Sequence, residues 1–277
     1  MWKGDYRGLD KSNRVQFGST CKFKVSGNIM SLIFGDNFED KTDLTNCNYC
    51  FCYLFYNCSH LVDASNLILP ATTLAEGCYQ NMFYGCNSLT SAPQILPATT
   101  LAMQCYDSMF YGCNSLTSAP QILPATTLAA SCYVSMFSGC SSLTAAPELP
   151  ATTLARSCYS SMFSGCNSLT TAPVLPATTL ASSCYNSMFR NCSSLTTAPE
   201  LPATTLERSC YSSMFYNCTN LNYIKAMFTT TPSGIYTSNW VRGVSSTGTF
   251  VKNAAATWDV TNNSGVPTGW TVETATA

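Results

Sequence analysis

The sequence predicts a curved α/β repeat solenoid, with short parallel strands on the inner face, helices on the outer face and β-rich caps at both ends. The first observation is a repeated motif, because six copies of Pro-Ala-Thr-Thr-Leu begin at Pro70, Pro97, Pro124, Pro150, Pro176 and Pro202. The second is that each copy is followed by a Cys-Tyr dipeptide, and the third is a period of 26–27 residues. A fixed period of this length is typical of stacked repeats, each of which buries its apolar side only against its neighbours.

The chain is expected to divide into three segments. Residues 42–222 form the solenoid, with one degenerate and six regular repeats of 26–28 residues. Residues 1–41 form an N-terminal β-hairpin cap and residues 223–277 a C-terminal β cap. Caps of this kind shield the apolar ends of a repeat array from water.

Each cap is predicted from its own residue pattern. The hairpin is predicted from alternating apolar residues, with a turn at Ser26-Gly27-Asn28; they are Val15/Phe17, Phe23/Val25 and Ile29 to Phe34. In the C-terminal segment, Trp240, Trp258 and Trp270 lie among Gly, Asn and Thr-rich turns. We interpret these tryptophans as apolar cover for the last repeat, with a carbohydrate-stacking platform as the alternative.

Apolar residues recur every four positions after each Pro-Ala-Thr-Thr motif. In residues 97–123 they form two adjacent rows, which are Leu101, Cys105, Met109 and Cys113, and Ala102, Tyr106 and Phe110. Two such rows predict an amphipathic helix of about three turns. The residue before the second cysteine is always Gly or Asn. Because these two residues adopt the left-handed conformation most readily, they predict the end of that helix.

The segment Ser-Leu-Thr-x-Ala-Pro predicts a very short strand of a parallel sheet, closed by a proline that has no amide to donate. Strands stack about 4.8 Å apart and helices about 8–10 Å apart, so the array is expected to bend. Strand positions that point away from the core form an uncharged strip on the inner face, which is the candidate binding surface. It consists of Thr90, Ser91, Thr117, Ser118, Thr144, Ala145, Thr170, Thr171, Thr196 and Thr197. A regular lattice such as ice or a crystalline glycan is an alternative ligand for such a strip.

The 17 cysteines are interpreted as buried thiols. Fourteen form seven pairs eight residues apart, from Cys50/Cys58 to Cys210/Cys218. In a helix that spacing separates the sulfurs by about 12 Å, beyond disulfide reach. Cys21, Cys47 and Cys52 lie outside the pairing, and one bridge near the N-terminus is left open. Cys47, Cys50 and Cys52 form the closest cluster of thiols, but no second C-x-x-C pair accompanies Cys47 and Cys50, and His60 is the only histidine. No metal or other cofactor is therefore expected.

Composition argues against several classes of function. Charged residues make up 10% of the chain and the net charge is −1, so nucleic acid is not an expected partner and isolated Lys and Arg side chains are expected to be solvated. No apolar run of about 18 residues predicts a membrane span. The first residues lack the apolar core of a signal peptide, which indicates a fragment of a longer secreted protein or a chain that needs no export. His60 has no carboxylate at a motif-like spacing, so no enzymatic activity is expected.

The repeat unit resembles the BspA-like leucine-rich repeats of bacterial surface proteins, which also occur in phage-encoded proteins. The residues that carry the resemblance are Cys140, Leu143, Ala146, Leu149, Pro150, Leu154, Phe163 and Cys166. The chain departs from that pattern at Pro147, where the strand would often continue. The resemblance implies a non-enzymatic extracellular or cell-surface protein that mediates recognition or adhesion through a protein or glycan partner. The alternative is a structural subunit of a phage particle, fibre or extracellular filament, with self-association end to end.

Overall fold

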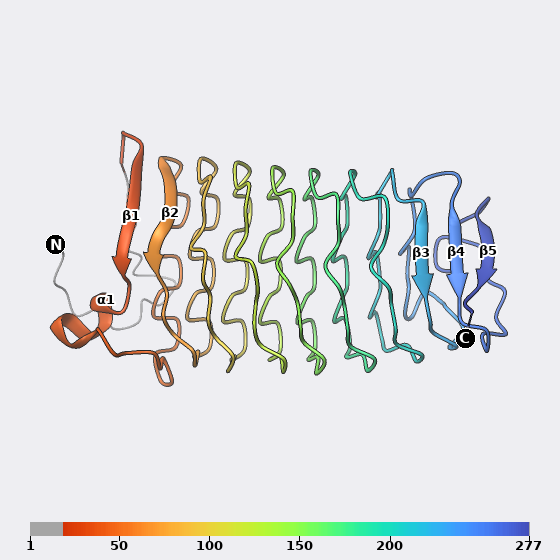
Figure 1. Cartoon of the computed structure of the whole chain (residues 1–277), viewed down its shortest axis with the longest axis horizontal. Coiled ribbons are helices and arrows are strands. Elements are labelled where there is room, and N and C mark those ends of the chain that lie inside the picture. The colour runs from red at the N-terminus through yellow and green to blue at the C-terminus, as the bar shows by residue number, and fades with distance from the viewer. Residues whose placement is uncertain (1–18, 277) are drawn as a thin grey trace.

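The computed structural model describes residues 19–276 as one long row of coils (Figure 1). Near the N-terminus lie β1 (Phe23–Asn28), α1 (Ser31–Phe34), the 3-10 turn η1 (Gly35–Asn37) and β2 (Leu61–Ile68). Near the C-terminus lie β3 (Tyr223–Ala226), β4 (Thr249–Lys252) and β5 (Thr271–Thr274). Strand β1 pairs with β2, and β3, β4 and β5 form a second sheet in that order; all three pairings are parallel.

Between the two sheets, successive coils are joined on the same side by single parallel bridges. Examples are Ser91↔Ser118 and Ala145↔Thr171. The predicted parallel strands are therefore present, but most are reduced to one bridged residue. The physical reason is the proline of each Ser-Leu-Thr-x-Ala-Pro segment, such as Pro147 two residues after the bridged Ala145, because proline cannot donate to the next rung of the ladder.

The helices predicted on the outer face are not formed. Each of these segments is instead a run of overlapping turns, which we call the turn ribbon; in one coil it covers residues 156–166. Within it Ser157, Ser161 and Gly165 have positive φ angles of 56°, 56° and 76°. The same four-residue interval of left-handed residues recurs in every coil from residue 49 to residue 217.

Hydrogen bonding explains why the ribbon replaces a helix. In residues 157–166 the odd-numbered amides donate to carbonyls of the next coil at 2.7–3.0 Å, and the even-numbered amides donate to the carbonyl three residues back at 3.1–3.2 Å. All of these amides are thus satisfied without the i to i−4 bonds of an α-helix. The spacing of the apolar rows agrees with the ribbon, since a strict period of four drifts by about 40° per turn around a helix of 3.6 residues.

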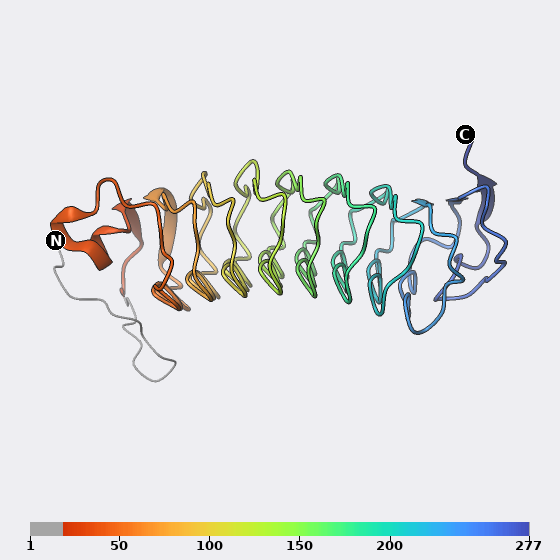
Figure 2. The same ribbon diagram turned by 90° about the horizontal axis from the view of Figure 1, so that it is seen from below.

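The predicted bend is also absent, and the coils form a nearly straight rod (Figures 1 and 2). The bend was expected because packed helices would be spaced more widely than the strands on the other side. Phenylalanines of neighbouring ribbons have ring centroids only 5.2–5.9 Å apart. This distance is close to the strand spacing of about 4.8 Å, so both sides of the rod advance by nearly the same rise. Figure 2 shows the strands and the turn ribbons on opposite sides of the rod.

The core is built from ladders of equivalent residues. Tyrosines of adjacent coils stack at 5.5–5.9 Å between ring centroids, and the last of them packs against Trp240. The strand leucines, such as Leu143 and Leu169, are fully buried. Stacking of identical side chains means that each coil completes the core of the next, as the repeat pattern predicts.

The N-terminal segment differs from the expected hairpin. Phe23 and Val25 lie in β1, which pairs in parallel with β2, and Val15 and Phe17 lie outside the described residues. Residues 31–34, expected as part of the second strand, form α1. Asn28 ends the strand, because its Oδ1 accepts from the Met30 amide at 2.9 Å and its carbonyl accepts from the Ser31 hydroxyl at 2.9 Å.

The C-terminal strands continue the stack of coils. Trp240, Trp258 and Trp270 are buried, and the Trp240 indole donates to the Gly265 carbonyl at 2.8 Å. Burial leaves these rings no free face for a sugar. The boundaries at residues 41 and 222 stay a prediction.

Candidate binding surface

The uncharged strip predicted from the sequence, which we call the hydroxyl strip, lies on the face of the rod that carries the strands. We call this face the strand side. Nine of its ten residues are exposed and Ser91 is half-buried. Two hydroxyls are fixed by the preceding coil: Thr90 Oγ1 donates to the Val62 carbonyl at 2.9 Å, and Thr117 Oγ1 donates to the Thr90 carbonyl at 3.2 Å. With their protons engaged in this way, these oxygens present lone pairs outward. The strip is therefore an ordered row of polar groups on a stiff backbone.

A row of exposed apolar side chains runs beside the strip, and sequence reasoning missed it. The row occupies the position before a buried leucine in successive coils. We call it the apolar ledge; its members are Ile68, Ile95, Ile122 and Val174, which are 53%, 74%, 41% and 78% exposed. Glu148 and Glu200 take the equivalent position in the other two coils. The signal in the sequence was an apolar residue between two prolines, as in Pro93-Gln94-Ile95-Leu96-Pro97.

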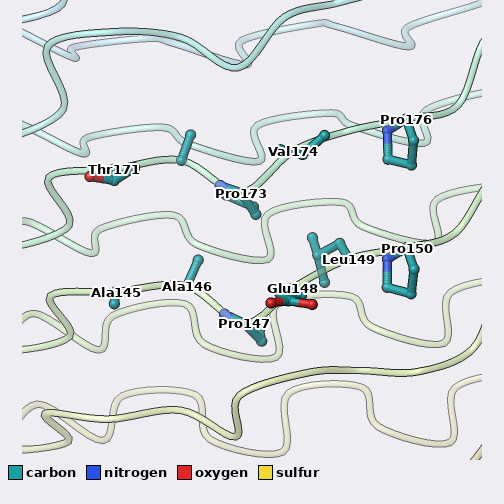
Figure 3. A pocket seen from close by; sticks show the side chains of 11 residues that line it. Ala145, Ala146, Pro147, Glu148, Leu149, Pro150, Thr171, Pro173, Val174 and Pro176 are labelled. Carbon is teal, nitrogen blue, oxygen red and sulfur yellow. The ribbon is translucent and has the colours of Figure 1, made fainter.

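Two shallow grooves cross this ledge between neighbouring coils. The larger, of about 420 Å³, lies between residues 145–150 and residues 171–176. Figure 3 shows the equivalent residues of the two coils side by side, with Val174 and Glu148 at its centre. The second groove, of about 360 Å³, is formed by Ile68, Ile95 and their neighbours. Alanine, proline and branched side chains form most of both walls, so the grooves can accept apolar groups, and Thr171 and Glu148 supply polar contacts at the larger one.

Charged groups on this side are few and mostly paired. Lys225 Nζ lies 3.0 Å from Glu200 Oε1, and Lys24 Nζ lies 3.2 Å from Asp63 Oδ2. Hydrogen bonds from Ser65, followed by the contact with Lys24, lower the pKa of Asp63. Recognition on the strand side therefore depends on shape, apolar contact and hydroxyl groups more than on charge.

The remaining predicted features lie apart from this surface. His60 is exposed, and its Nδ1 lies 3.3 Å from the Ser59 hydroxyl. All 17 cysteines are free thiols, including Cys21, Cys47 and Cys52, whose pairing had been left open. Within residues 19–276, no group of three or more His, Cys, Asp or Glu side chains is arranged to hold a metal ion. In that same part of the chain, no helix is long and apolar enough to cross a membrane.

These features define a solenoid repeat protein, in which stacked coils present rows of equivalent side chains along a rod. The sequence pattern of the BspA type leucine rich repeat region matches this chain in 6 copies, over residues 37–147 and 104–238. The chain therefore belongs to the BspA type leucine-rich repeat family. Leucine-rich repeat domains generally mediate protein binding and are generally non-enzymatic, and this family is typically secreted or surface-exposed in bacteria.

Two solved structures are similar to the chain. A leucine-rich repeat protein from Bacteroides ovatus is 19% identical with a TM-score of 0.36, and the match covers 74% of this chain and 58% of that one. A leucine rich repeat protein from T. pallidum is 20% identical with a TM-score of 0.36, over 70% of this chain and 72% of that one. The chain thus spans little more than half of the Bacteroides ovatus protein. No curated protein matches the chain.

Proposed function

We propose that this protein is a non-enzymatic recognition or adhesion protein, extracellular or at a cell surface, which binds a protein or glycan partner along the strand side of the rod. The observation that carries the proposal is the apolar ledge beside the hydroxyl strip. Four of the eight large hydrophobic side chains that are exposed in the described residues lie in this one row. Clustered exposed apolar side chains rimmed by polar groups are typical of interaction sites.

The backbone supports this role because it holds the surface in one shape. Leu123 N donates to the Glu148 carbonyl at 3.1 Å and Glu148 N donates to the Gln121 carbonyl at 2.8 Å, so the ledge of one coil is in register with the next. A surface that is already ordered loses little conformational entropy when a partner binds.

The test begins with the oligomeric state of the purified chain, followed by glycan and host-protein arrays. A partner found there is then titrated against Val174→Lys and against Met103→Lys, which places the same charge at an exposed apolar residue on the turn ribbon. We expect Val174→Lys to weaken binding by about tenfold or more, as for a charge placed in an apolar contact, and Met103→Lys to leave it unchanged. Arrays without a partner, or equal losses in both variants, would refute the proposal.

A structural subunit of a phage particle, fibre or extracellular filament is the second candidate, and strand β5 favours it. All four residues of β5 are exposed, and it is the last strand of its sheet within the described residues. An open strand edge is a template for pairing with another chain. Concentration-dependent elongation in analytical ultracentrifugation, abolished by Val272→Pro, would support this candidate; a monomer at all concentrations would exclude it.

A further inference from the structure

The turn ribbons carry an unequal distribution of charge along the rod. In the four N-terminal ribbons, up to Cys140, the charged residues are Glu76 and Asp107. The next four contain all four arginines of the described chain, which are Arg156, Arg190, Arg208 and Arg242. The sequence alone predicts isolated, solvated arginines, yet Arg156 and Arg208 occupy the same position two coils apart, and so do Arg190 and Arg242.

These arginines are exposed and have no acidic partner. None of them forms an ion pair with a carboxylate of the described residues. Arg190 lies in the coil before Tyr216 and Arg242 in the coil after it. Both pack over the Tyr216 ring instead, with their guanidinium carbons 4.8 Å and 5.6 Å from its centre. Two like charges held on either side of one ring, without a counter-charge, create a local positive potential that favours an anion.

The backbone fixes the positions of these side chains. Gly165, Asn191 and Asn217 donate their amides to the carbonyls of Arg190, Tyr216 and Arg242 at 2.7 Å, 2.8 Å and 2.8 Å, so these four successive coils are locked in register. The guanidinium groups that pack over the ring can still direct their N–H groups outward to a carboxylate or sulfate.

We infer that this arginine surface, formed by Arg156, Arg190, Arg208, Arg242 and Tyr216, binds a linear acidic polysaccharide that lies along the turn ribbons. A repeated interval between the charges on a straight rod suits an extended polymer with regularly spaced carboxylates or sulfates better than a small anion. The residues between the arginines are mainly serine and asparagine, such as Ser160 and Asn186, whose hydroxyl and amide groups can hydrogen-bond to sugar hydroxyls.

The same arrangement argues against single-stranded nucleic acid as the natural ligand. Base stacking requires an aromatic ring with an open face. The guanidinium groups of Arg190 and Arg242 lie over the Tyr216 ring, so the site offers its ring edge and its cations. This surface is separate from the apolar ledge and does not depend on the function proposed for the strand side.

The experiment uses the full chain, with heparin and hyaluronan oligosaccharides as probes and oligo(dT) and poly-glutamate as competing polyanions, each titrated by calorimetry at low and at physiological salt. We expect an acidic glycan to bind more tightly than either competitor and more weakly as salt increases. Arg190→Gln combined with Arg242→Gln should weaken that binding by about tenfold, because two charge-assisted contacts are lost. Arg190→Lys with Arg242→Lys should retain part of it, since charge remains but the planar donor geometry does not.

The matched control removes the same charge elsewhere, through Lys22→Gln and Lys41→Gln, and should bind as the parent chain does. Equal melting temperatures for all variants establish that each is folded. The inference is overturned if neither glycan binds, if the control loses as much affinity as the arginine variant, or if oligo(dT) or poly-glutamate binds as tightly as the glycan.

Discussion

At the scale of single residues, cysteine recurs at two positions of each coil because its small, weakly polar side chain meets two needs of the core. In the six pairs from Cys78/Cys86 onward, the second thiol donates to a phenylalanine carbonyl of the preceding coil, as from Cys140 to Phe110 at 3.1 Å and from Cys218 to Phe189 at 2.9 Å. Cysteine fills the core as an apolar group and still supplies a weak donor. Burial raises the pKa of these thiols, to about 12 for Cys113 and Cys166.

This chemistry predicts which thiols react in the folded protein. We expect iodoacetamide at neutral pH to modify exposed Cys21 first and half-buried Cys47 more slowly, since burial and the nearby Asp43 raise the pKa of Cys47. The buried thiols should react only after unfolding, because the thiolate is the reactive form. Mass spectrometry of peptides from native and denatured samples measures the order. Early modification of Cys140, or a mass that indicates a disulfide within a pair, would contradict the packing.

Asp107 gives a second prediction at this scale. Its carboxylate accepts from Gln80 Nε2 at 2.9 Å and from Ser108 Oγ at 2.7 Å. Burial nevertheless raises the pKa of Asp107 above its usual value. A folded-state pKa above the unfolded one means that stability falls as pH rises between the two values, and this loss persists at neutral pH.

Asp107→Asn removes the charge and keeps an oxygen for Gln80. We expect a higher urea midpoint than the parent chain at neutral pH, and no gain at about pH 3, where the carboxyl is protonated in both states. Glu148→Gln, at an exposed carboxylate, is the control and should leave the midpoint unchanged. A loss of stability in Asp107→Asn at neutral pH would show that the charge contributes more than its burial costs.

At the scale of the element, the sequence allowed the strand side to be predicted but not the other side. In each coil two consecutive strip residues lie between a buried leucine and a buried or half-buried alanine, as Thr170 and Thr171 do between Leu169 and Ala172. The proline that ends each ladder is explicit in the sequence. The ribbon was missed because Cys105, Met109 and Cys113 match a helix and a four-residue ribbon almost equally over three turns. The distinguishing signal was present at three positions of each regular coil, where Ser, Asn, Gly and Gln recur every four residues with positive φ, as at Gln104, Ser108 and Gly112.

Substitution at Ser161 separates the ribbon from a helix. Ser161 has φ 56°, so Ser161→Gly should change the free energy of unfolding by less than about 0.5 kcal/mol, whereas Gly in a helix interior costs about 1 kcal/mol. Ser161→Val forces a β-branched residue into the left-handed region and should cost about 1–3 kcal/mol. Ser160→Val, at the adjacent residue without positive φ, is the matched control and should cost less. Urea unfolding of the three variants measures these values, and an equal cost for both valines would contradict the ribbon geometry.

The candidate surfaces depend on how coils align, and this limited what the sequence could predict about them. The hydroxyl strip needed only the residue pattern within one strand segment. The apolar ledge and the arginine surface needed the register between coils. This register places Val174 beside Glu148 (Figure 3) and Tyr216 between two arginines. A shift of one residue between coils would turn these side chains away from one another. The two sites therefore depend on the backbone hydrogen bonds between coils, which the sequence does not specify.

At the scale of the whole molecule, the rod has no central core that a single coil could disrupt. Each ribbon donates to the next through up to five amides, as residues 157–165 do. In the central coils, rings such as Tyr133 and Phe137 stack on the equivalent rings of both neighbours. Stability is then a sum of coil and interface contributions. The nearly equal rise on both sides of the rod means that a coil can be removed without changing the shape of those that remain.

Deletion of one whole repeat tests this description. Removing residues 150–175 joins Leu149 to Pro176 and restores the Leu-Pro-Ala-Thr-Thr sequence at the junction. We expect this chain to fold, with the same circular dichroism per residue and a slightly smaller urea m-value, because m follows the surface exposed on unfolding. Removing only residues 163–175 is the matched control. It leaves a truncated ribbon without its strand, breaks the register of every later ladder, and should prevent cooperative unfolding. If both deletions unfold alike, the coils are not independent units stacked through nearest-neighbour contacts.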